Sequence, residues 1–430
     1  MPSLTLIGLL LWIFVSFITL IISGSFYYEL INIWIPLVPL FIFFFAYILL
    51  QTLRLVNLKR DKDSILTKTT DKKYSMILNE IETLSTRIGF IVSVTVVSLL
   101  VYTLNILGVS LTQAQQLRDI FYSQEGMQLL GGQFFIWINW LAMAVVYMIF
   151  LIGISIAVAK KHVFNRPLLL AIGMIVLLSL MTGGRGGIVN AIIFSLGGWL
   201  SVAAPKDLKY KKTIRRFFFI ALIFFVILFI QFTNRAEGAD LIIIKTFVKY
   251  FVGPIFAFDQ LIITGIDNDI RSSIGRVGSA LIGLDTIIVS GFARGVLGLQ
   301  IESALASTSY FYQNGVNISS SEIMNAHYTG GARWYIDFGL AGYFLFFSLL
   351  ASLCIYVDME KARLVRRRVA FGYPIIYACV FVSVIYSTRE FMFDSPEYYM
   401  AFGGLMVLYT IVKRKSRLFR RVRNNPTYSS

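Results

Sequence analysis

Long apolar runs alternate with short polar segments along the whole chain, and the runs have the length of membrane-spanning helices. Continuous runs of about 20 apolar residues are typical of transmembrane helices, whereas a membrane β-barrel gives alternating segments of about ten residues. The pattern therefore predicts an all-α polytopic membrane protein with about ten spans. We expect these spans at 4–23, 30–53, 88–108, 134–159, 167–182, 187–204, 217–233, 334–357, 369–386 and 399–412.

The polar segments between the runs predict the orientation of the spans. Cytoplasmic loops of membrane proteins carry an excess of Lys and Arg. Most of the 39 Lys and Arg residues lie in connections on one side, including the predicted cytoplasmic loop 54–87 and the basic tail 413–430. Both termini are therefore predicted to be cytoplasmic. The long connection 234–333, which precedes the span at 334–357, is then predicted to be an outer loop.

Two stretches inside this outer loop are apolar enough to be spans, yet they carry charged residues. The stretch 241–265 contains Asp259, and the stretch 276–300 contains Asp285. Because a charge in the middle of a bilayer is costly, we expect helices that lie on the outer surface or dip into it. If both stretches cross instead, the chain gains two spans and every downstream segment keeps its side.

The composition agrees with a single integral-membrane domain over 1–430. Hydrophobic residues make up 57% of the chain and charged residues 14%, against about 25% charged residues in soluble domains. The net charge of +16 lies mainly in the predicted cytoplasmic segments, so it requires no nucleic-acid partner. The N-terminus becomes apolar almost at once, which predicts a retained first span rather than a cleaved signal peptide.

Ionisable residues are almost absent from the expected spans. Asp337 is the one charged residue inside a span, close to its outer end. Ion-coupled transporters place acidic or basic residues near the middle of the membrane. The sequence therefore favours chemistry at the outer face over transport.

The arginines on the predicted outer side indicate an anionic ligand. A guanidinium group binds phosphate oxygens through two parallel hydrogen bonds. Arg185 stands among glycines in the hairpin 183–187, where bare backbone N–H groups can also face an anion. The alternatives are that these side chains extend to lipid headgroups or pair with acidic neighbours, as Arg333 can with Asp337 four residues later. The set is Arg185, Arg235, Arg271, Arg276, Arg294, Arg333 and Arg389.

His327 is the first candidate for a general base, because it lies in a polar, glycine-bearing segment close to Arg333. The reserve candidates are Asp337 and Glu390. A purely structural role is the alternative for this histidine. Arg389, Glu390 and Asp394 in the last outer turn either line the same site or cap two helices.

Neither a metal site nor a cofactor site is predicted. The chain has no P-loop, no zinc-type spacing of Cys and His, and no serine nucleophile elbow. The Asp-x-Asp pattern at 61–63 lies in a short cytoplasmic loop. The same pattern at 267–269 can bind a cation on the outer side, although such short pairs also arise by chance.

Two motifs give the chain a family resemblance. The hairpin Thr182–Gly186 reads Thr-Gly-Gly-Arg-Gly, and 328–342 reads Tyr-x-x-Gly-x-Arg-Trp-Tyr-x-Asp-Phe-Gly-x-x-Gly. With the long outer loop between them, they resemble the O-antigen or capsular polysaccharide polymerases of the Wzy type. The family hairpin often reads Gly-Ser-Arg-Gly, from which Gly184 departs. The resemblance covers the whole topology and implies a membrane glycosyltransferase of the GT-C type.

The resemblance also implies a reaction and its partners. A growing glycan would move from undecaprenyl pyrophosphate onto a fresh lipid-linked oligosaccharide, at the outer face of a bacterial cytoplasmic membrane. The implied partners are the undecaprenyl-pyrophosphate-linked oligosaccharide, membrane lipids, a flippase and a chain-length regulator. Negative charge accumulates on the leaving pyrophosphate, so arginines that are held in place stabilise the transition state.

This hypothesis assigns a role to each candidate residue. The pyrophosphate would be bound by Arg185, Arg235, Arg276, Arg333 and Arg389. The catalytic candidates are His327, Arg185, Arg333, Glu390 and Asp337. Tyr328, Trp334 and Tyr335 would stack on sugar rings, although an aromatic belt at the membrane interface explains them equally well. The alternative functions are an O-antigen ligase, a flippase or transporter of lipid-linked sugars, and a structural or receptor-like membrane protein.

Overall fold

The computed structural model describes residues 3–60, 71–109, 124–160, 165–182, 186–201, 248–275, 278–294, 297–301, 303–305, 316–320, 323–324, 329–364, 372–389, 394–408 and 410. These residues are mostly helical, and five of their helices are long and apolar enough to cross a membrane. The five are α1 (Leu4–Ile22), α2 (Trp34–Arg60), α3 (Asp71–Leu107), α6 (Gln133–Lys160) and α15 (Ala332–Leu364). The chain is therefore a helical, membrane-embedded protein, as its sequence pattern predicts.

Each predicted span that falls on described residues coincides with a helix. The shorter apolar helices are α7 (Arg166–Thr182), α8 (Gly186–Leu200) and α16 (Gly372–Tyr386), and residues 396–408 are also helical. The predicted span 217–233 lies outside the described residues. The described residues also contain a short antiparallel pair of strands, β1 (Val316–Asn317) and β2 (Ile323–Met324).

Helices extend into the predicted cytoplasmic loop 54–87. α2 continues to Arg60, and α3 begins at Asp71. Leu, Lys, Arg and Glu all have high helix propensity, so both helices continue beyond their apolar stretches.

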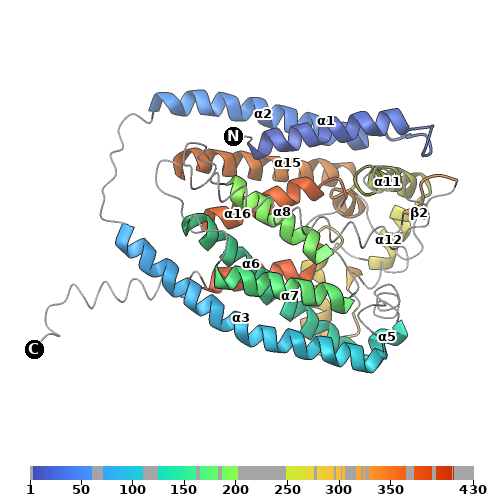
Figure 1. Ribbon diagram of the computed structural model, residues 1–430. Helices are drawn as coiled ribbons and strands as arrows, with labels where there is room; N and C mark the ends of the chain where they lie inside the picture. The colour runs from blue at the N-terminus through green and yellow to red at the C-terminus, as the bar shows by residue number, and fades with distance from the viewer. Residues whose placement is uncertain are drawn as a thin grey trace, which may run out of the picture. The chain divides into compact units, whose positions relative to one another are not determined.

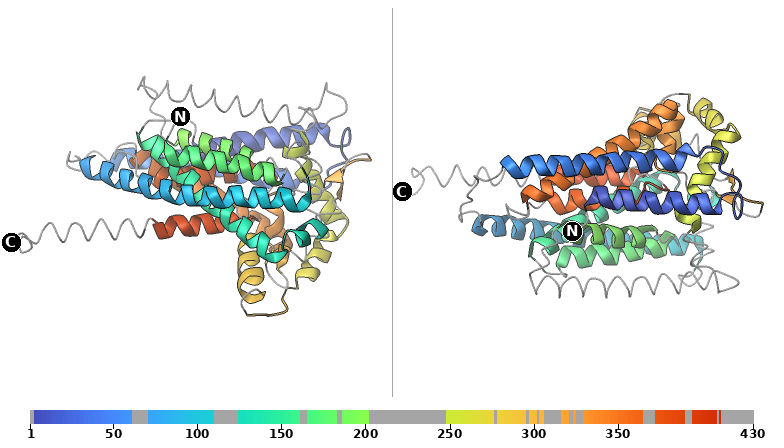
Figure 2. Two further views of the ribbon diagram at one scale, coloured as in Figure 1. Left: turned by 60° about the horizontal axis from the view of Figure 1, so that its bottom comes forward. Right: turned by 90° about the horizontal axis from the view of Figure 1, so that it is seen from above.

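The chain divides into two compact units, and each is described by itself. The first unit comprises Met1–Ser64, Phe225–Arg368 and Ile376–Pro396. In this unit α1 and α2 form a helical hairpin that packs against α15 (Figures 1 and 2). The rings of Trp12 on α1 and Phe347 on α15 meet edge to face in this contact, with centroids 5.2 Å apart. Both side chains are fully buried.

Two buried carboxylates bind backbone N–H groups at the start of α1 and just before α2. Asp358 accepts hydrogen bonds from the N–H of Leu4 at 2.9 Å, the N–H of Thr5 at 3.1 Å and the Thr5 hydroxyl at 2.8 Å. The first N–H groups of a helix lack partners within the helix, so a carboxylate there is favourable. Asp259 accepts the N–H groups of Ile31 and Asn32, just before α2 begins. The predicted span 334–357 stops one residue short of Asp358, which is why this buried charge was not expected.

Short helical elements form the described part of 253–294. They are α11 (Gly253–Ile263), α12 (Ile266–Ile274), α13 (Ile282–Thr286) and the π-helix η2 (Ile287–Arg294). The longest of them, α11, has 11 residues and spans about 16 Å, roughly half of a bilayer's hydrocarbon core. None of these four elements is therefore long enough to cross a membrane by itself.

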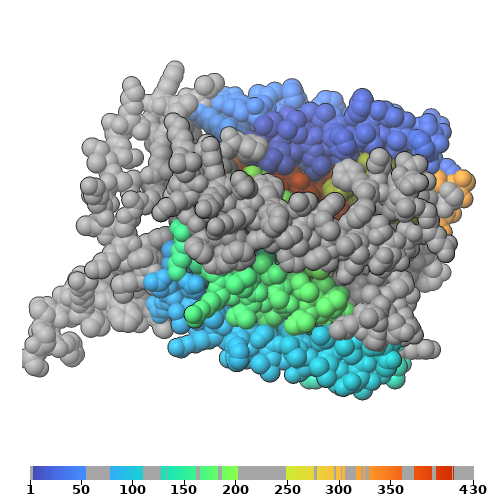
Figure 3. Space-filling view, viewed as in Figure 1, coloured from blue at the N-terminus to red at the C-terminus, as the bar shows by residue number. Residues whose placement is uncertain are grey.

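The second unit comprises Ile65–Phe224, Val369–Ile375 and Glu397–Ser430. Its most buried helix is α6, against which α3, α7, α8 and the short α5 (Gln124–Leu129) pack. The surfaces of α3 (light blue) and α7 (green) meet directly in the space-filling view (Figure 3). An apolar helix surrounded by other helices forms the core of this unit.

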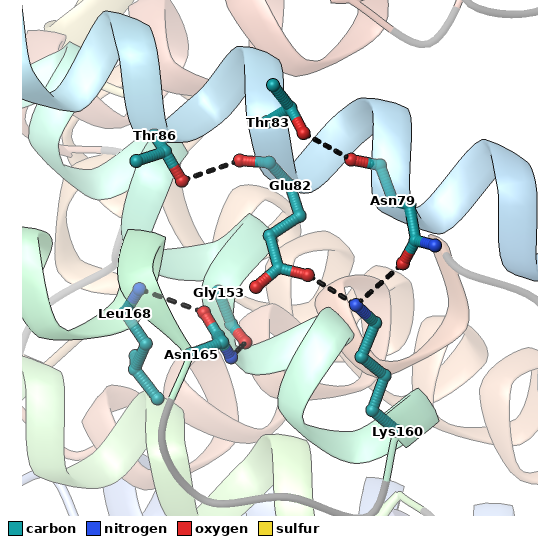
Figure 4. A network of polar contacts seen from close by, with 8 residues as sticks. All are labelled: Asn79, Glu82, Thr83, Thr86, Gly153, Lys160, Asn165 and Leu168. Atoms are coloured by element: carbon teal, nitrogen blue, oxygen red, sulfur yellow. Dashed lines mark hydrogen bonds and ion pairs between the residues drawn. The ribbon is translucent and has the colours of Figure 1, made fainter.

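Polar contacts join three of these helices at one end (Figure 4). The Lys160 ammonium at the end of α6 forms an ion pair with Glu82 and donates to the Asn79 side-chain oxygen at 2.9 Å, both on α3. Asn165 precedes α7 and accepts an N–H from its first turn at 3.0 Å, as helix-capping residues do. The Asn165 amide also donates to the Gly153 carbonyl of α6 at 2.8 Å, so α3, α6 and α7 are tied together.

Candidate functional site

A break near the start of α15 forms the frame of the candidate site. Gly339 has φ 62° and ψ −152°, a backbone conformation that is essentially restricted to glycine. Residues 332–338 therefore form a short helical segment, called here the arm, that is separate from the long helix that follows. The arm carries four of the predicted site residues: Arg333, Trp334, Tyr335 and Asp337.

Two further glycines allow the arm to lie directly against the long helix. A Cβ atom on Gly342 would overlap the carbonyl oxygen of Trp334, and one on Gly331 would lie 2.7 Å from the Tyr343 ring. Both contacts are closer than a packed interior allows, so side chains at these positions would push the arm away. The glycines of the motif at 328–342 thus have a steric role, because they let the chain fold back along its own helix.

Arg333 lies at the beginning of the arm and is oriented by an ion pair. Its Nε donates to Asp394 Oδ2 at 2.8 Å, and only 17% and 12% of the two side chains are exposed. The spacing of Arg333 and Asp337 allowed a pair between those two residues, but the structure gives both of them other partners. A charge-assisted bond of this length fixes the direction of the guanidinium group.

Arg389 lies on a turn that is joined to the arm. The N–H of Gly330 donates to the Ser387 carbonyl at 2.9 Å, which links the residues before the arm to the turn after α16. The Arg389 Cζ lies 5.0 Å from the ring centroid of Tyr386 and 5.5 Å from that of Tyr250. Both distances are within the range of cation–π attraction. The structure therefore places Arg389 on a segment hydrogen-bonded to the one that leads into Arg333.

This junction lies beside the middle of α1. Trp12 is the ninth of the 19 residues of α1, and its indole N–H donates to the Ser387 hydroxyl at 3.1 Å. The Cβ position of Gly331 also lies 3.0 Å from Phe347, whose ring packs on Trp12. The arm therefore brings Arg333 alongside the helices of this unit, whereas the sequence pattern placed it at their outer ends.

Asp337 anchors the other end of the arm. Its carboxylate accepts three consecutive backbone N–H groups, from Gly278 at 3.2 Å, Ser279 at 3.3 Å and Ala280 at 2.8 Å. Hydrogen bonds to an ionised acceptor are stronger than those between neutral groups. The predicted reserve base is thus engaged with the backbone that precedes α13.

Arg271 contacts the same end of the arm from α12. Its Nε donates to the Ile336 carbonyl at 2.6 Å, and its Nη2 lies 3.4 Å from the Tyr335 carbonyl. The last carbonyls of a helix lack partners within it, and a cation there also interacts favourably with the helix dipole. The break at Gly339 leaves these carbonyls available to Arg271.

The predicted sugar-stacking residues lie in aromatic clusters. The Tyr335 ring stacks on Trp34, with centroids 5.8 Å apart and an interplanar angle of 25°. The Trp34 indole N–H donates to Asn32 at 3.1 Å, and the Asn32 amide donates to Asp259 at 2.8 Å. Trp334 packs on Phe346, with centroids 6.1 Å apart. Tyr335 and Trp34 are both partly exposed, so this aromatic surface is accessible beside the arm.

The second arginine motif lies in the second unit, between α7 and α8. Arg185 itself lies outside the described residues, but the helices on either side of it are described. A Cβ atom on Gly187 would lie 3.0 Å from the Ser179 hydroxyl and 3.7 Å from the Tyr147 hydroxyl. Tyr147 is the fifteenth of the 28 residues of α6. Gly187, the second residue of α8, therefore lies beside the middle of α6.

Part of the predicted site falls outside the described residues. These residues are His327, Glu390, Arg185, Arg235, Arg276 and Tyr328. The structure adds Trp12 and Ser387, which sequence reasoning missed. Both look like ordinary residues of apolar helices, and no spacing in the sequence connects them to the arm.

The outer Asp-x-Asp pattern does not converge on one point. Asp267 is only 5% exposed, whereas Asp269 is an exposed residue of the same helix. Residues two positions apart do not share a helix face. Within the described ranges, no group of three His, Cys, Asp or Glu side chains could hold a metal ion. Burial raises the pKa of Asp267 because the buried carboxylate loses its hydration.

Comparisons of the chain with protein-family models, curated proteins and solved structures give no match.

Proposed function

We propose that this protein is a membrane glycosyltransferase that polymerises lipid-linked oligosaccharide repeat units. The growing glycan is transferred from undecaprenyl pyrophosphate onto the sugar of a fresh lipid-linked unit. The reaction takes place on the side of the bacterial cytoplasmic membrane that faces away from the cytoplasm. A flippase and a chain-length regulator are its expected partners.

The observation that carries the proposal is the joining of two arginine-bearing segments beside the middle of α1. The Gly330–Ser387 hydrogen bond joins the segment before Arg333 to the turn of Arg389, and Asp394 orients the first arginine. Arginines held in place away from bulk water stabilise negative charge strongly, because the low dielectric screens them little. A pyrophosphate leaving group develops such a charge as its bond to the sugar breaks.

The chemistry requires one bond to break and one to form. The bond between the anomeric carbon of the donor glycan and the pyrophosphate oxygen breaks, and undecaprenyl pyrophosphate leaves with the electron pair. The oxygen of an acceptor hydroxyl forms the new bond to the anomeric carbon, and its proton passes to a general base. His327 and Glu390 are the candidates for this base. The aromatic surface of Tyr335 and Trp34 offers a place for a sugar ring beside the arm.

Deleting the gene and analysing the cell's surface polysaccharide on a gel tests this function. A polymerase defect converts a ladder of chain lengths into a single repeat unit, because ligation and export continue. Loss of even the single unit, with lipid-linked material on the outer face, indicates a ligase. The same loss with lipid-linked material on the inner face indicates a flippase.

Complementation of the deletion tests the arginine site directly. Wild-type protein should restore the ladder, and Arg389→Gln should restore at most about a tenth of it, since charged hydrogen bonds contribute strongly. Arg166→Gln is the matched control, because Arg166 is an exposed arginine at the start of α7 that does not belong to the candidate site. A full ladder from Arg389→Gln at normal protein levels would contradict the assignment.

A further inference from the structure

We infer that Asp337 and Arg271 are positioning residues, which hold the arm so that Arg333 points into the anion site. This inference rests on the proposed function and deepens it. It assigns Asp337 a different role from the general base that the sequence allowed, and it gives Arg271 a role that no pattern in the sequence indicates.

The hydrogen bonds of Asp337 are the first reason to assign it a positioning role. One carboxylate oxygen accepts the N–H of Ser279, and the other accepts the N–H groups of Gly278 and Ala280. A base needs an oxygen that the acceptor hydroxyl can approach, but both oxygens of Asp337 already face the backbone. Burial disfavours the ionised carboxylate, and the three N–H donors offset part of that cost, so Asp337 depends on this contact.

Arg271 provides a second attachment, in which backbone carbonyls of the arm accept the hydrogen bonds. It donates to the carbonyls of Tyr335 and Ile336, which are the exposed acceptors at the end of the short helix. Asp337 therefore binds N–H groups outside the arm, while the arm's own carbonyls bind Arg271. Together they hold the arm to the segment 271–280 through its side chain and through its backbone.

The geometry of the arm connects these attachments to Arg333. Arg333 and Asp337 are four residues apart, so they lie about one turn from each other on one helix face. The close contacts at Gly331 and Gly342 prevent the arm from settling in another place without losing its packing. If the end at Asp337 is released, the arm can tilt, and the guanidinium of Arg333 moves relative to Asp394 and Arg389.

The test uses purified full-length protein and inorganic pyrophosphate as the probe. Pyrophosphate binding is measured by calorimetry for wild type, Asp337→Asn and Arg271→Gln, and again for each substitution combined with Arg333→Gln. Hydrogen exchange of the peptides that cover 329–338 reports on the arm itself. In cells lacking the gene, the same variants are scored for the polymer that they make.

The expected result is a specific pattern of coupling. Asp337→Asn and Arg271→Gln each speed exchange in the arm and weaken pyrophosphate binding by about tenfold. In the Arg333→Gln background neither substitution weakens binding further, because residues that act through one another are not additive. Polymer is reduced by Asp337→Asn but is still made.

Two matched substitutions control for the loss of charge. Asp285→Asn removes a carboxylate of α13 that accepts the N–H of Ala304 at 2.6 Å. Arg166→Gln removes an exposed cation at the start of α7. Both should leave exchange in the arm and pyrophosphate binding at wild-type values.

Other results would overturn the inference. Unchanged exchange in the arm, or an equal loss of binding with and without Arg333, would show that the two residues do not act through it. Abolished polymer with normal pyrophosphate binding in Asp337→Asn would restore Asp337 as the base. If wild-type protein binds no pyrophosphate, the proposed anion site fails, while the exchange measurement still decides whether the two residues hold the arm.

Discussion

Two regions of this molecule each place a glycine of an arginine motif beside the middle of a long helix, and they differ in the groups that surround it. In the first unit, the junction before the arm lies beside Trp12, the ninth of the 19 residues of α1. In the second unit, Gly187 at the start of α8 lies beside Tyr147, the fifteenth of the 28 residues of α6. Each region brings a glycine of a predicted arginine motif next to the middle of a long helix.

The two regions differ in what surrounds the turn. The arm is held by charged groups, namely the Arg333–Asp394 pair, Asp337 and Arg271. The described polar groups closest to Gly187 are the Ser179 and Tyr147 hydroxyls, and the charged group that acts on Tyr147 is Glu397. A buried charge is costly unless it is paired and hydrogen-bonded, so the arm requires its partners. The comparison indicates that the arm is the more sensitive of the two regions to substitution.

The largest effect is expected from the arginine of the arm. Arg333→Lys keeps the charge but loses the planar fork that holds Asp394 and a phosphate together, so polymer should fall by on the order of a hundredfold. Arg185→Lys in the hairpin loses the same fork, and we expect a loss of similar size. Polymer is scored on gels from cells lacking the chromosomal gene.

Membrane levels of both arginine variants, measured by immunoblot, are the control for this experiment. A wild-type ladder from Arg333→Lys would remove the arm from the anion site. A wild-type ladder from Arg185→Lys alone would mean that only the region with fixed charges binds the pyrophosphate.

A smaller effect is expected from substituting a glycine that lets the arm lie against the long helix. Gly342→Ala puts a Cβ atom into the Trp334 carbonyl, so the arm must move and polymer should fall by about tenfold. Gly173→Ala in α7 is the counterpart, because no atom lies within 4 Å of its Cβ position. Ala also favours a helix by up to about 1 kcal/mol, so Gly173→Ala should keep full activity. Equal activity of the two variants would show that the close packing of the arm does not matter.

Loss of the hydrogen bond between Trp12 and Ser387, beside the middle of α1, should have a weaker effect. Trp12→Phe keeps an aromatic ring against Phe347 but removes the N–H that binds Ser387, a loss of about 1 kcal/mol. We expect a threefold to fivefold reduction in polymer, roughly the factor that this free energy gives. Ser383→Ala, which removes a hydroxyl bonded within α16 to Cys379, is the control. An unchanged ladder from Trp12→Phe would mean that the backbone hydrogen bond between Gly330 and Ser387 keeps the turn in place without the Trp12 N–H.

The class of the fold follows directly from the sequence, because apolar runs of spanning length can form only membrane helices. The broken course of α15 does not follow, since a hydropathy pattern reads the arm and the long helix as one span. The motif at 328–342 contains the needed residues, but Gly339 and Gly342 reveal the fold-back only through their backbone conformation and contacts. Sequence spacing also paired Arg333 with Asp337, because it carries no information on Asp394 or on the backbone at 278–280.

The smallest effect is expected from substituting Asp267, and it should change the melting temperature in a pH-dependent way. Burial raises the pKa of Asp267 above its ordinary value, so the folded protein holds this proton more tightly than the unfolded chain. Stability from this residue is then present at low pH and is lost as the pH rises through the raised pKa. Asp267→Asn removes the penalty, so it should raise the melting temperature at pH 7.5 by on the order of 1–2 °C and leave it unchanged at pH 3, where the carboxyl is protonated in both states. Thermal unfolding of the detergent-purified protein measures this difference, and Asp269→Asn controls for net charge. A lower melting temperature at pH 7.5 would mean that ionised Asp267 is stabilised within the fold, which would extend the set of fixed charges around the arm.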